Sequence, residues 1–391
     1  MKQAIILAAG EGQRLRPFTV NRPKAMLSIA DKPMLQYVVE ALAHTGIRNI
    51  VLVVGYRKDQ VLDYMGTGEQ FGVEITYVTQ KEQLGTAHAL AQAKASAEEQ
   101  FLVLPGDKLI EADTVAHLIE AKPATVLVKR VANPARYGVV TVSRNRVKGI
   151  LEKPKQAESN LVNTGIYVFS KDIFTYIEPE LSIPDALNNM IADGHAVNAL
   201  ETTNTWLDVV YPWDILALNE AVLGRISPGL SGTIEANVSM KGTVSVGKGT
   251  VIRSNSYIAG PVVIGEGCEI GPNVCIMAAT SIGDNVTISP FTEIKNSVIG
   301  GDVNIGPGSI IHDSVIDKGC TIKGHFTAFN SPTEIRVNED YHVVNVGAML
   351  GEACKLDNNV TAQAGVIVGN YCQVQAMKLI SGRLPDKSIV Y

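Results

Sequence analysis

The stretch Ile264-Gly265-Glu266-Gly267-Cys268-Glu269-Ile270-Gly271-Pro272-Asn273-Val274-Cys275-Ile276 places an isoleucine at every sixth position. This spacing holds without exception from Val246 to Ile294 and continues to Ile322 with two five-residue steps. Gly, Asn or Asp recurs just after the aliphatic residue, where turns tolerate left-handed backbone conformations. A hexapeptide period predicts a parallel β-helix, in which the aliphatic side chains point inward and three hexapeptides complete one coil.

The period has clear limits on both sides. A polar loop is expected at about 331–344, after which the aliphatic row resumes at Leu350, Leu356, Ala362, Val368 and Val374, and residues 381–391 form a tail. Before the repeat, Pro and Gly gather in residues 225–233, which indicates a linker. The predicted domains are therefore residues 1–224, a linker at 225–233, and a β-helix domain at 234–391.

The first half alternates strand and helix signals. Residues 50–54 and 101–104 are short apolar runs that predict buried strands, and residues 34–45 and 86–97 have the spacing of helices. This rhythm predicts a mostly parallel sheet covered by helices, with antiparallel strands added after residue 124. Ligands of such sheets bind beyond the carboxyl ends of the strands.

A cationic loop follows the first predicted strand. It reads Leu7-Ala8-Ala9-Gly10-Glu11-Gly12-Gln13-Arg14-Leu15-Arg16-Pro17-Phe18-Thr19 and continues to Arg22-Pro23-Lys24. Small residues let backbone N–H groups approach a phosphate closely. A Walker loop would need Gly-Lys-Ser/Thr, and a Rossmann fingerprint would need a third glycine where Leu15 stands. The loop suits a nucleoside triphosphate without matching either motif.

The order Gly-x-Gly-x-Arg-Leu-x-Pro-x-Thr leading to Pro-Lys resembles the signature of the sugar-1-phosphate nucleotidylyltransferases. The resemblance implies an α/β Rossmann-like nucleotidyltransferase domain that joins a nucleoside triphosphate to a sugar-1-phosphate and releases pyrophosphate with Mg²⁺. It implies that Arg14 neutralises the pyrophosphate and that Lys24 holds phosphate oxygens. Asp107 and Asp208 are the expected metal carboxylates, with Asp214 as an alternative to Asp208. A purely regulatory subunit is disfavoured because all four residues are present.

Two further groups of residues have predicted binding roles. The segment 80–87 resembles the base-recognition segment of uridylyl- and thymidylyltransferases, and its glycine and threonine open a helix with available N–H and hydroxyl groups. The predicted nucleotide-binding residues are Leu7, Ala8, Ala9, Gly10, Gly12, Gln80, Gln83, Gly85 and Thr86. The predicted sugar-phosphate-binding residues are Gly138, Glu152, Lys153 and Asn163.

The base and the sugar stay open at this point. Pro105 stands where bacterial N-acetylglucosamine-1-phosphate uridylyltransferases have Tyr before Gly-Asp. Both dTTP and UTP remain candidates for the nucleotide, and both glucose-1-phosphate and N-acetylglucosamine-1-phosphate remain candidates for the sugar.

The two halves together resemble the bifunctional archaeal nucleotidylyltransferase/acetyltransferases, which implies a left-handed parallel β-helix, a homo-trimer or a multiple of it, and acetyl-CoA as a second substrate. That family places a base in Pro-His-x-x-Tyr-Val-Gly-Asp-Ser. Here Pro307 falls at the His and Ile310 at the Tyr, and His312 and His325 are expected as surface histidines. Asn330 is expected to keep one amino-sugar contact. We therefore expect acetyl transfer to be lost, leaving oligomerisation or regulation; the alternative is a true bifunctional enzyme.

Composition restricts the remaining possibilities. A net charge of −5 argues against broad nucleic-acid binding, and no apolar run reaches membrane-spanning length. The N-terminus shows no signal-peptide pattern. Five cysteines without a Cys-x-x-Cys motif predict reduced, packed thiols. A cytoplasmic location is expected.

Overall fold

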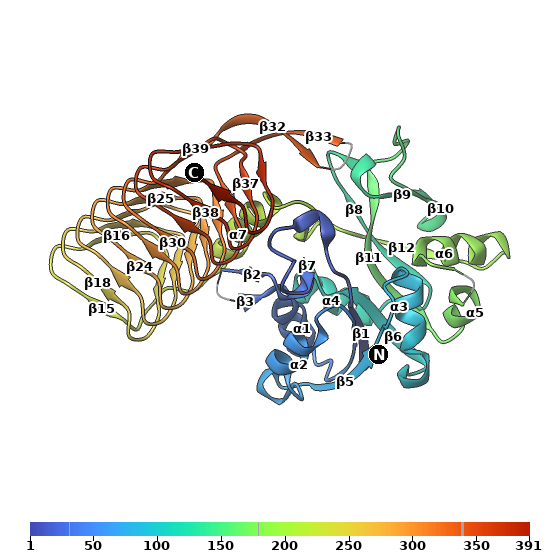
Figure 1. Cartoon of the computed structure of the whole chain (residues 1–391). Coiled ribbons are helices and arrows are strands. Elements are labelled where there is room, and N and C mark those ends of the chain that lie inside the picture. The colour runs from blue at the N-terminus through green and yellow to red at the C-terminus, as the bar shows by residue number, and fades with distance from the viewer. Residues whose placement is uncertain (31, 179, 338–339) are drawn as a thin grey trace. The chain divides into compact units, whose positions relative to one another are not determined.

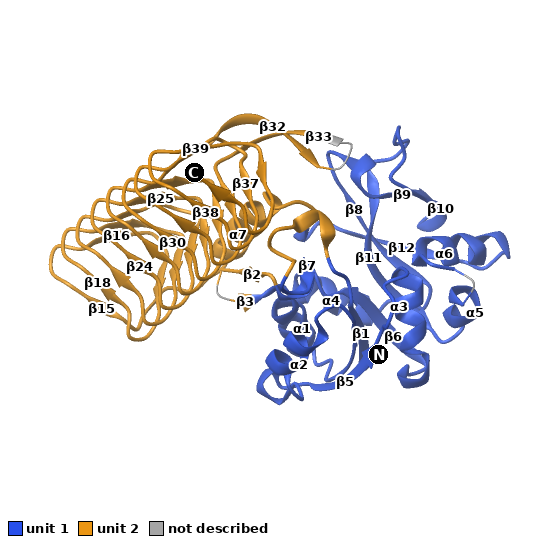
Figure 2. Ribbon diagram, in the orientation of Figure 1, with its two compact units in different colours: residues 1–11, 21–26, 33–208 blue, residues 12–20, 27–32, 209–391 orange. Residues whose placement is uncertain are grey.

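The computed structural model describes residues 1–30, 32–178, 180–337 and 340–391 (Figure 1). Contacts divide the chain into two units (Figure 2). Unit 1 comprises Met1–Glu11, Asn21–Met26 and Pro33–Asp208, and unit 2 comprises Gly12–Val20, Leu27–Lys32 and Val209–Tyr391. This division differs from the boundaries expected from composition, because two short N-terminal segments have most of their contacts with the C-terminal half.

Unit 1 is built on a nine-stranded sheet with the order β5-β4-β1-β6-β11-β8-β12-β10-β9. The strands β4, β5 and β6 extend a parallel core around β1, whereas β11 runs antiparallel to both β6 and β8. The prediction of a parallel core with antiparallel additions is confirmed. The strand bounds are β1 (Gln3–Ala8), β4 (Asn49–Val54), β5 (Glu74–Thr79), β6 (Gln100–Pro105), β8 (Thr125–Arg130), β9 (Gly138–Ser143), β10 (Arg146–Glu152), β11 (Leu161–Ser170) and β12 (Asn198–Thr202).

Helices cover both faces of this sheet. Alternate residues of β1 therefore belong to two cores: Ala4 and Ile6 pack with α1, α2 and α4, and Ile5 packs with α3, α5 and α6. This explains why the strand is apolar at almost every position. The helix bounds are α1 (Met34–His44), α2 (Lys58–Met65), α3 (Thr86–Gln92), α4 (Ala112–Ile119), α5 (Ile173–Ile177) and α6 (Ile183–Ala192).

Short elements complete unit 1 and the adjoining segments. The helix predicted at residues 86–97 ends at Gln92, and the remainder forms a separate 3-10 turn, Lys94–Ser96. Two strands, β7 (Lys108–Ile110) and β13 (Trp206–Asp208), pair antiparallel outside the main sheet. The others are the pair β2 (Ser28–Ile29) and β3 (Lys32–Pro33) and the 3-10 helices η1 (Gln13–Leu15), η2 (Lys24–Met26), η3 (Glu69–Phe71), η4 (Lys94–Ser96) and η5 (Pro134–Arg136).

Unit 2 contains three parallel sheets that stack short strands from successive coils. The first sheet has β14 (Gly229–Leu230), β17 (Val244–Val246), β20 (Val262–Ile264), β23 (Thr280–Ile282), β26 (Val298–Ile299), β29 (Val315–Ile316), β34 (Met349–Leu350), β37 (Ile367–Val368) and β40 (Arg383–Leu384). The second has β15 (Thr233–Ile234), β18 (Val251–Ile252), β21 (Glu269–Ile270), β24 (Thr287–Ile288), β27 (Asn304–Ile305), β30 (Thr321–Ile322), β35 (Lys355–Leu356), β38 (Gln373–Val374) and β41 (Ile389–Val390). The third has β16 (Ser239–Lys241), β19 (Tyr257–Ala259), β22 (Cys275–Ile276), β25 (Glu293–Lys295), β28 (Ile310–His312), β31 (Thr327–Ala328), β36 (Thr361–Ala362) and β39 (Leu379–Ile380).

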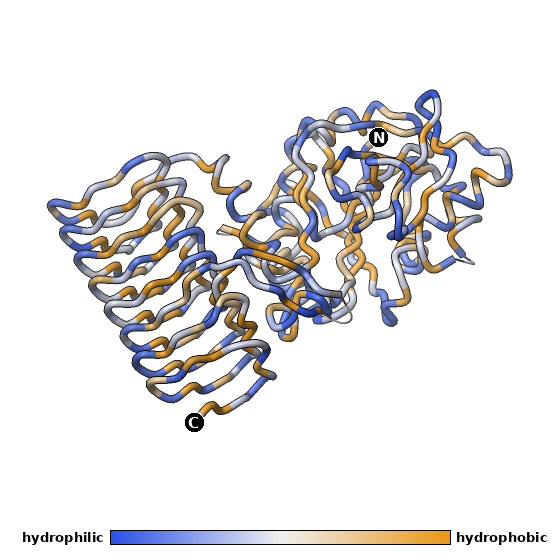
Figure 3. The backbone as a smooth tube through the Cα atoms, turned by 90° about the horizontal axis from the view of Figure 1, so that it is seen from above, coloured by the Kyte–Doolittle hydropathy of each residue, from blue (hydrophilic) through white to orange (hydrophobic). Residues whose placement is uncertain are grey.

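The hexapeptide prediction is confirmed by this architecture. The aliphatic row from Val246 to Ile322 is buried inside the coils, so the fold is a left-handed parallel β-helix. Figure 3 shows hydrophobic and hydrophilic stretches alternating along the stacked coils. Helix α7 (Asp214–Leu223) belongs to this unit, where Asn219 donates to Ala279 O and accepts from Ser281 Oγ.

Three segments around the repeat differ from expectation. Strands β14 and β15 lie within or next to the predicted linker and already pair with β17 and β18 of the coils. The predicted tail contains β40 and β41, which pair with β37 and β38 and so continue the helix. The predicted polar loop is an antiparallel hairpin of β32 (Ser331–Val337) and β33 (Asp340–Val346); residues 338–339 of that loop lie outside the described residues.

All five cysteines are free thiols, four of them buried, in agreement with the prediction. Among the described residues, no helix is both long enough and apolar enough to span a bilayer.

Candidate active site

Asp107 and Asp208 are brought together by the small sheet of β7 and β13. Asp107 directly precedes β7, and Asp208 ends β13 opposite Lys108 in the antiparallel register. Residues about a hundred positions apart therefore meet because one strand pair joins them. Lys24 opens η2, and its backbone N–H lies 3.5 Å from Gly10 O, at the end of the loop that follows β1.

Lys24 is the common partner of the two aspartates. Its Nζ forms an ion pair with Asp107 Oδ2 and lies 3.4 Å from Asp208 Oδ1. The three side chains are only 17%, 21% and 12% exposed. Burial alone would lower the pKa of Lys24, but the charges of Asp107 and Asp208 outweigh it and raise that pKa above its ordinary value. The ammonium group therefore stays charged at neutral pH.

Lys108 is a second cation at this site that the sequence analysis did not single out. Its Nζ lies 3.6 Å from Asp208 Oδ2, donates to Thr164 O at 3.0 Å and lies 4.8 Å from the centre of the Trp206 ring. Burial would raise the pKa of Asp208, yet the charges of Lys108 and Lys24 lower it to about 2. The available sequence signal was its position directly after Asp107.

The alternative second carboxylate, Asp214, has a different task. Its Oδ2 accepts hydrogen bonds from the backbone N–H groups of Val210 and Tyr211, both at 2.9 Å. It therefore stabilises the turn that leads into α7, in unit 2, whereas Asp208 faces Lys24 in unit 1.

At the end of β1, Leu7 to Ala9 are closely packed, whereas Gly10 faces open space. Leu7 pairs with Pro105, Leu7 O accepts from Gly106 N at 2.9 Å, and Ala9 O accepts from Tyr56 N at 3.1 Å. A Cβ on Gly106 would lie 3.0 Å from Ala8 Cβ, whereas a Cβ on Gly10 would meet no described atom within 4 Å. The backbone at Gly10 is thus accessible to a ligand.

The remainder of the loop, Gly12–Val20, belongs to unit 2. Gly12 has a φ of 76°, and its carbonyl accepts from Leu15 N at 2.9 Å and from the buried Thr19 hydroxyl at 2.8 Å. Phe18 N donates to Leu15 O at 3.0 Å. The loop is therefore internally tied, and it leaves the Arg14 side chain exposed.

Gln80 is 3% exposed, and its amide is oriented by the start of α3. The Nε2 atom lies 3.2 Å from Gly85 O and 2.9 Å from His88 Nδ1. In the tautomer of His88 that leaves Nδ1 unprotonated, both hydrogens of this amide nitrogen are used, and Oε1 is the acceptor that we assign to a ligand. His88 is a further residue that sequence analysis missed; its signal was a position two residues after Thr86. Gln83 Nε2 donates to Gln80 O at 3.3 Å.

The start of α3 is less available than expected. Ala87 N donates to Leu181 O at 3.1 Å, and Thr86 Oγ1 accepts from Ile183 N at 3.2 Å. A Cβ on Gly85 would lie 2.1 Å from Leu181 O, so only glycine allows this approach. The backbone N–H of Ala87 at this helix start is therefore occupied by the segment before α6.

The predicted sugar residues lie on strands β9, β10 and β11, except Lys153, which directly follows β10. Gly138 and Glu152 are cross-strand partners, and a Cβ on Gly138 would lie 2.7 Å from Glu152 Oε1. Burial of this carboxylate raises the pKa of Glu152 against the opposing charge of Lys153. Lys153 has a φ of 42° and donates its N–H to Tyr137 O at 3.1 Å.

Asn163 is held within β11. Its Nδ2 donates to Tyr167 Oη at 2.7 Å, and its Oδ1 accepts from Gly165 N at 2.9 Å. Each amide atom retains one further hydrogen-bonding position. Thus Asn163 fixes a bulged turn in the strand.

Unit 2 contains a second cluster of side chains, around His312, in the region where the resemblance predicts the acetyltransferase centre. His312 Nε2 lies 2.9 Å from Glu293 Oε1, its ring lies edge-on to Phe329 at 5.3 Å, and its side chain is 16% exposed. His312 is therefore partly buried, whereas His325 is exposed. Phe329 and Asn330 also line a cavity of about 300 Å³.

The carboxylate pair fits a single cation. Both Asp107 and Asp208 reach one ammonium nitrogen, so their oxygens converge on a space that a positive ion can share. Within the described residues no group of three or more His, Cys, Asp or Glu side chains converges as a metal site. A pair of carboxylates completed by substrate phosphates and water is the usual protein environment of Mg²⁺.

Comparison with known proteins identifies the class. The model of the nucleotidyl transferase family matches residues 3–224, more than half of the chain, and the chain belongs to this family. A model of the GMPPB C-terminal domain matches residues 258–331.

Full-length relatives narrow the class to sugar-1-phosphate nucleotidylyltransferases with a β-helix. The "bifunctional protein GlmU" of Methanocaldococcus jannaschii is 36% identical over 99% of this chain and 97% of its own. The "bifunctional sugar-1-phosphate nucleotidylyltransferase/acetyltransferase" of Sulfurisphaera tokodaii is 35% identical over 95% of both chains. A solved structure of a putative glucose-1-phosphate thymidylyltransferase from Bacillus anthracis is 29% identical, with a TM-score of 0.53, over 58% of this chain and 97% of that chain.

Proposed function

We propose that the protein transfers a nucleotidyl group from dTTP or UTP to glucose-1-phosphate or N-acetylglucosamine-1-phosphate and releases pyrophosphate. The observation that carries this proposal is the convergence of Asp107 and Asp208 on Lys24 beside the open backbone of Gly10. Two carboxylates and a fixed cation are the groups that phosphoryl chemistry requires, because catalysis consists mainly of in-line positioning and charge neutralisation.

The residues have distinct roles in this proposal. Mg²⁺, when bound, neutralises the phosphates and orients them for attack at the α-phosphorus. Asp107 and Asp208 would hold the ion, and Lys24 would neutralise phosphate oxygens beside it. Arg14 neutralises the departing pyrophosphate, and Lys153 binds the sugar phosphate. Lys108 keeps Asp208 ionised and oriented.

The orientation of Gln80 supports a uracil or thymine base. Its Oε1 is left as an acceptor, and both bases carry a donor at N3, whereas cytosine carries an acceptor there. A base is commonly read by hydrogen bonds on this edge. The proposal therefore excludes CTP as an efficient substrate.

The direct test is a matrix of nucleotides against sugar-1-phosphates, read by pyrophosphate release. We expect turnover with dTTP or UTP and at least tenfold less with CTP and ATP, whose ring nitrogens on this edge carry no hydrogen, since one unpaired hydrogen-bonding group costs on the order of 1–3 kcal/mol. Turnover with CTP equal to that with UTP would contradict the proposed role of Gln80.

His88→Ala is expected to raise the KM for the nucleotide roughly fivefold with little change in kcat, because the Gln80 amide loses the acceptor that orients it, at a cost of about 1 kcal/mol. Steady-state kinetics with varied nucleotide measures this. The matched control is Gln92→Ala, which removes the 3.2 Å contact on the other ring nitrogen of His88 and leaves Gln80 untouched. Equal effects of both variants would contradict the orienting role.

A second candidate function is acetyl transfer from acetyl-CoA to an amino-sugar-1-phosphate. One observation favours it: His312 has a carboxylate partner in Glu293, as a histidine base commonly does. Against it stand Pro307 and Ile310, where the family has His and Tyr.

For this second function the test is CoA release in the presence of glucosamine-1-phosphate. If His312 is the base, His312→Ala lowers the rate by about two orders of magnitude, and the exposed His325→Ala leaves it unchanged. Absence of CoA release from the unmodified protein would rule out acetyl transfer to this substrate.

We also propose that the β-helix assembles the protein into a homo-trimer or a multiple of it, and that the enzyme works in the cytoplasm. Free thiols at all five cysteines are typical of a reducing compartment. Light scattering on the purified chain measures the assembly, and a monomer would contradict it.

A further inference from the structure

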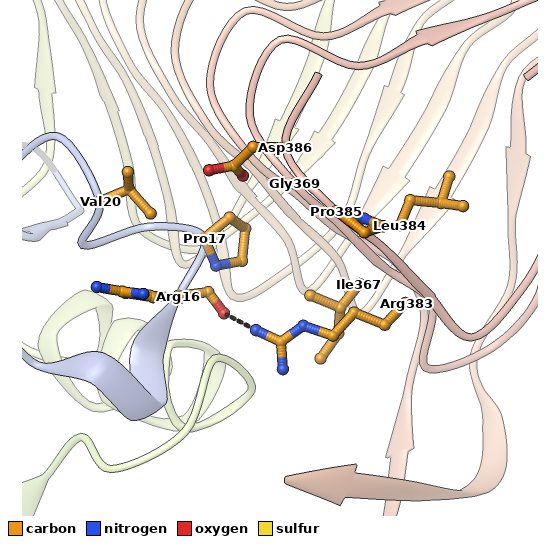
Figure 4. Close-up of a pocket in the computed structure, with 9 residues that line it drawn as sticks. All are labelled: Arg16, Pro17, Val20, Ile367, Gly369, Arg383, Leu384, Pro385 and Asp386. Atoms are coloured by element: carbon orange, nitrogen blue, oxygen red, sulfur yellow. Dashed lines mark hydrogen bonds between the residues drawn. The ribbon is translucent and has the colours of Figure 1, made fainter. Parts of the chain in front are cut away.

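The signature loop Gly12–Val20 is bound to the last coils of the β-helix. Within unit 2, Asn370 Nδ2 donates to Pro17 O at 3.2 Å, and Arg383 Nη2 donates to Arg16 O at 3.4 Å. Figure 4 shows the Arg16–Arg383 bond and Pro17 beside Gly369 and Asp386, which lie in turns of successive coils. Two consecutive carbonyl groups of the loop are thus held by side chains more than 350 positions later in the sequence.

Asn370 occupies a turn position whose ordinary task is known from another coil. Asp284, which follows Gly283, accepts from Glu266 N of the preceding coil at 2.7 Å. Asn370, which follows Gly369, accepts from Glu352 N in the same way, also at 2.7 Å. An aspartate performs this task equally well, so the turn alone does not call for an amide.

The amide of Asn370 adds a donor that an aspartate lacks. Its Nδ2 lies near Asp386 Oδ1 at 3.4 Å and closer to Pro17 O at 3.2 Å. The side chain is 1% exposed, and a buried amide fixed by neighbouring coils is a rigid support. The donor directed at the loop is therefore the feature that distinguishes position 370 from position 284.

The loop does not rest on continuous packing at this place. A cavity of about 260 Å³ lies between it and the coils, lined by Arg16, Pro17, Val20, Ile367, Gly369, Arg383, Leu384, Pro385 and Asp386 (Figure 4). Where packing leaves a space, directional hydrogen bonds decide the position of the backbone. The two bonds from Asn370 and Arg383 are such restraints.

We propose that Asn370 and Arg383 are positioning residues for nucleotidyl transfer, holding the loop in the conformation that binds the triphosphate. This rests on the proposed function of the loop. The bonds that close the loop upon itself, from Leu15 N and Thr19 Oγ1 to Gly12 O, transmit the restraint from Arg16 and Pro17 to Gly12 and Arg14. The C-terminal coils thereby determine the conformation of the loop.

The test compares Asn370→Ala, Arg383→Ala and their combination with the control Asp284→Ala. Asp284→Ala removes the same type of bond between coils, at a turn that makes no hydrogen bond to the loop among the described residues. We expect each single variant to raise the KM for the nucleotide about fivefold and the double variant to raise it at least twentyfold. Arg383→Lys retains a donor and is expected to recover part of the loss.

Hydrogen exchange of the ligand-free, full-length protein supplies a readout that does not depend on turnover. Peptides covering residues 12–20 are expected to exchange at least tenfold faster in the double variant and unchanged in Asp284→Ala. Unchanged loop exchange in the double variant, or an equal rise in KM in Asp284→Ala, overturns the proposal. Faster loop exchange in a protein without nucleotidyl transfer would uphold the restraint while refuting the proposed function.

Discussion

Asp107→Asn is expected to lower kcat by at least a thousandfold while leaving the fold intact. The substitution keeps the size of the side chain and removes the charge that pairs with Lys24 and that would hold Mg²⁺. Losing a metal carboxylate costs several kcal/mol of transition-state stabilisation, and each 1.4 kcal/mol corresponds to roughly a factor of ten in rate. Asp208→Asn is expected to have a similar effect because it pairs with the same cation.

Two measurements distinguish loss of a metal ligand in Asp107→Asn from a general loss of activity. Pyrophosphate release at increasing Mg²⁺ should show that the variant needs more metal as well as turning over slowly. The control is Asp214→Asn, since Asp214 binds backbone N–H groups at the start of α7, and we expect its turnover to stay within threefold of the unmodified enzyme. Turnover of Asp107→Asn within the same threefold range would refute the metal role.

Lys24→Met is expected to impair both activity and stability. Without the ammonium group, Asp107 loses its cation and Asp208 keeps only Lys108, so two carboxylates that are about one-fifth exposed or less face each other with one cation in place of two. Removing one partner of a buried ion pair costs about 3–5 kcal/mol, and partial exposure reduces this to about 2 kcal/mol here. We expect kcat to fall by two to three orders of magnitude, because a fixed cation at the phosphates is lost.

Metal and pH responses distinguish this explanation from a general packing defect. Mg²⁺ should raise the Tm of Lys24→Met more than that of the unmodified protein, since the metal replaces the missing charge. The pKa of Asp208 is lowered in the folded protein, so the ion pair stabilises above about pH 4 and its contribution disappears as the pH falls toward 2. The stability difference between the two proteins should therefore narrow at acid pH.

The exposed pair Lys94–Glu178 provides the control for this second expectation. Both side chains are more than half exposed, and surface pairs contribute at most about 1 kcal/mol. Lys94→Met should leave both activity and Tm nearly unchanged, without any dependence on Mg²⁺. A Tm for Lys24→Met equal to that of the unmodified protein at pH 7 would show that the two aspartates do not require the cation.

Local sequence patterns predicted most of the architecture. The aliphatic residue at every sixth position from Val246 onward predicted the coils, because each coil places its aliphatic side chains at the same inward-facing positions. The apolar run of β1 predicted a buried strand, and the helical spacing of the apolar residues in 34–45 predicted α1. These features are visible locally because burial on a regular element imposes a period on neighbouring residues.

The pairing of strands that are far apart in the sequence could not be predicted from local patterns. Residues 381–391 lack a strong aliphatic row, yet β40 and β41 pair with the preceding coil through backbone hydrogen bonds that any side chain allows. The grouping of residues 12–20 with the β-helix depends on Asn370 and Arg383, which no local pattern marks as partners. Two predicted breaks, at 225–233 and 331–344, were identified from composition, but composition did not reveal that backbone pairing continues through them.

At the candidate site, the catalytic residues could be predicted from the sequence, whereas the side chains that surround them could not. Lys24, Asp107 and Asp208 were predicted as a set, and they converge within unit 1. Lys108 and His88 were missed because their importance lies in contacts with Asp208 and Gln80, which depend on the β7–β13 register and on the first turn of α3. Thr86 was expected to offer its hydroxyl to a ligand; its Oγ1 accepts from Ile183 N, almost a hundred residues later, and its own hydrogen remains a donor.

The terminal position of β40 and β41 in the stack affects the thermal unfolding of the protein. A stack of coils behaves as a one-dimensional array in which each member is stabilised by its nearest neighbours, so the end member, having a single neighbour, frays first. Arg383, which holds the loop carbonyl of Arg16, lies in that end member. Fraying of one coil therefore removes one of the two restraints on the loop while the rest of the stack stays folded, and a rise in the KM for the nucleotide should precede the cooperative loss of β-structure.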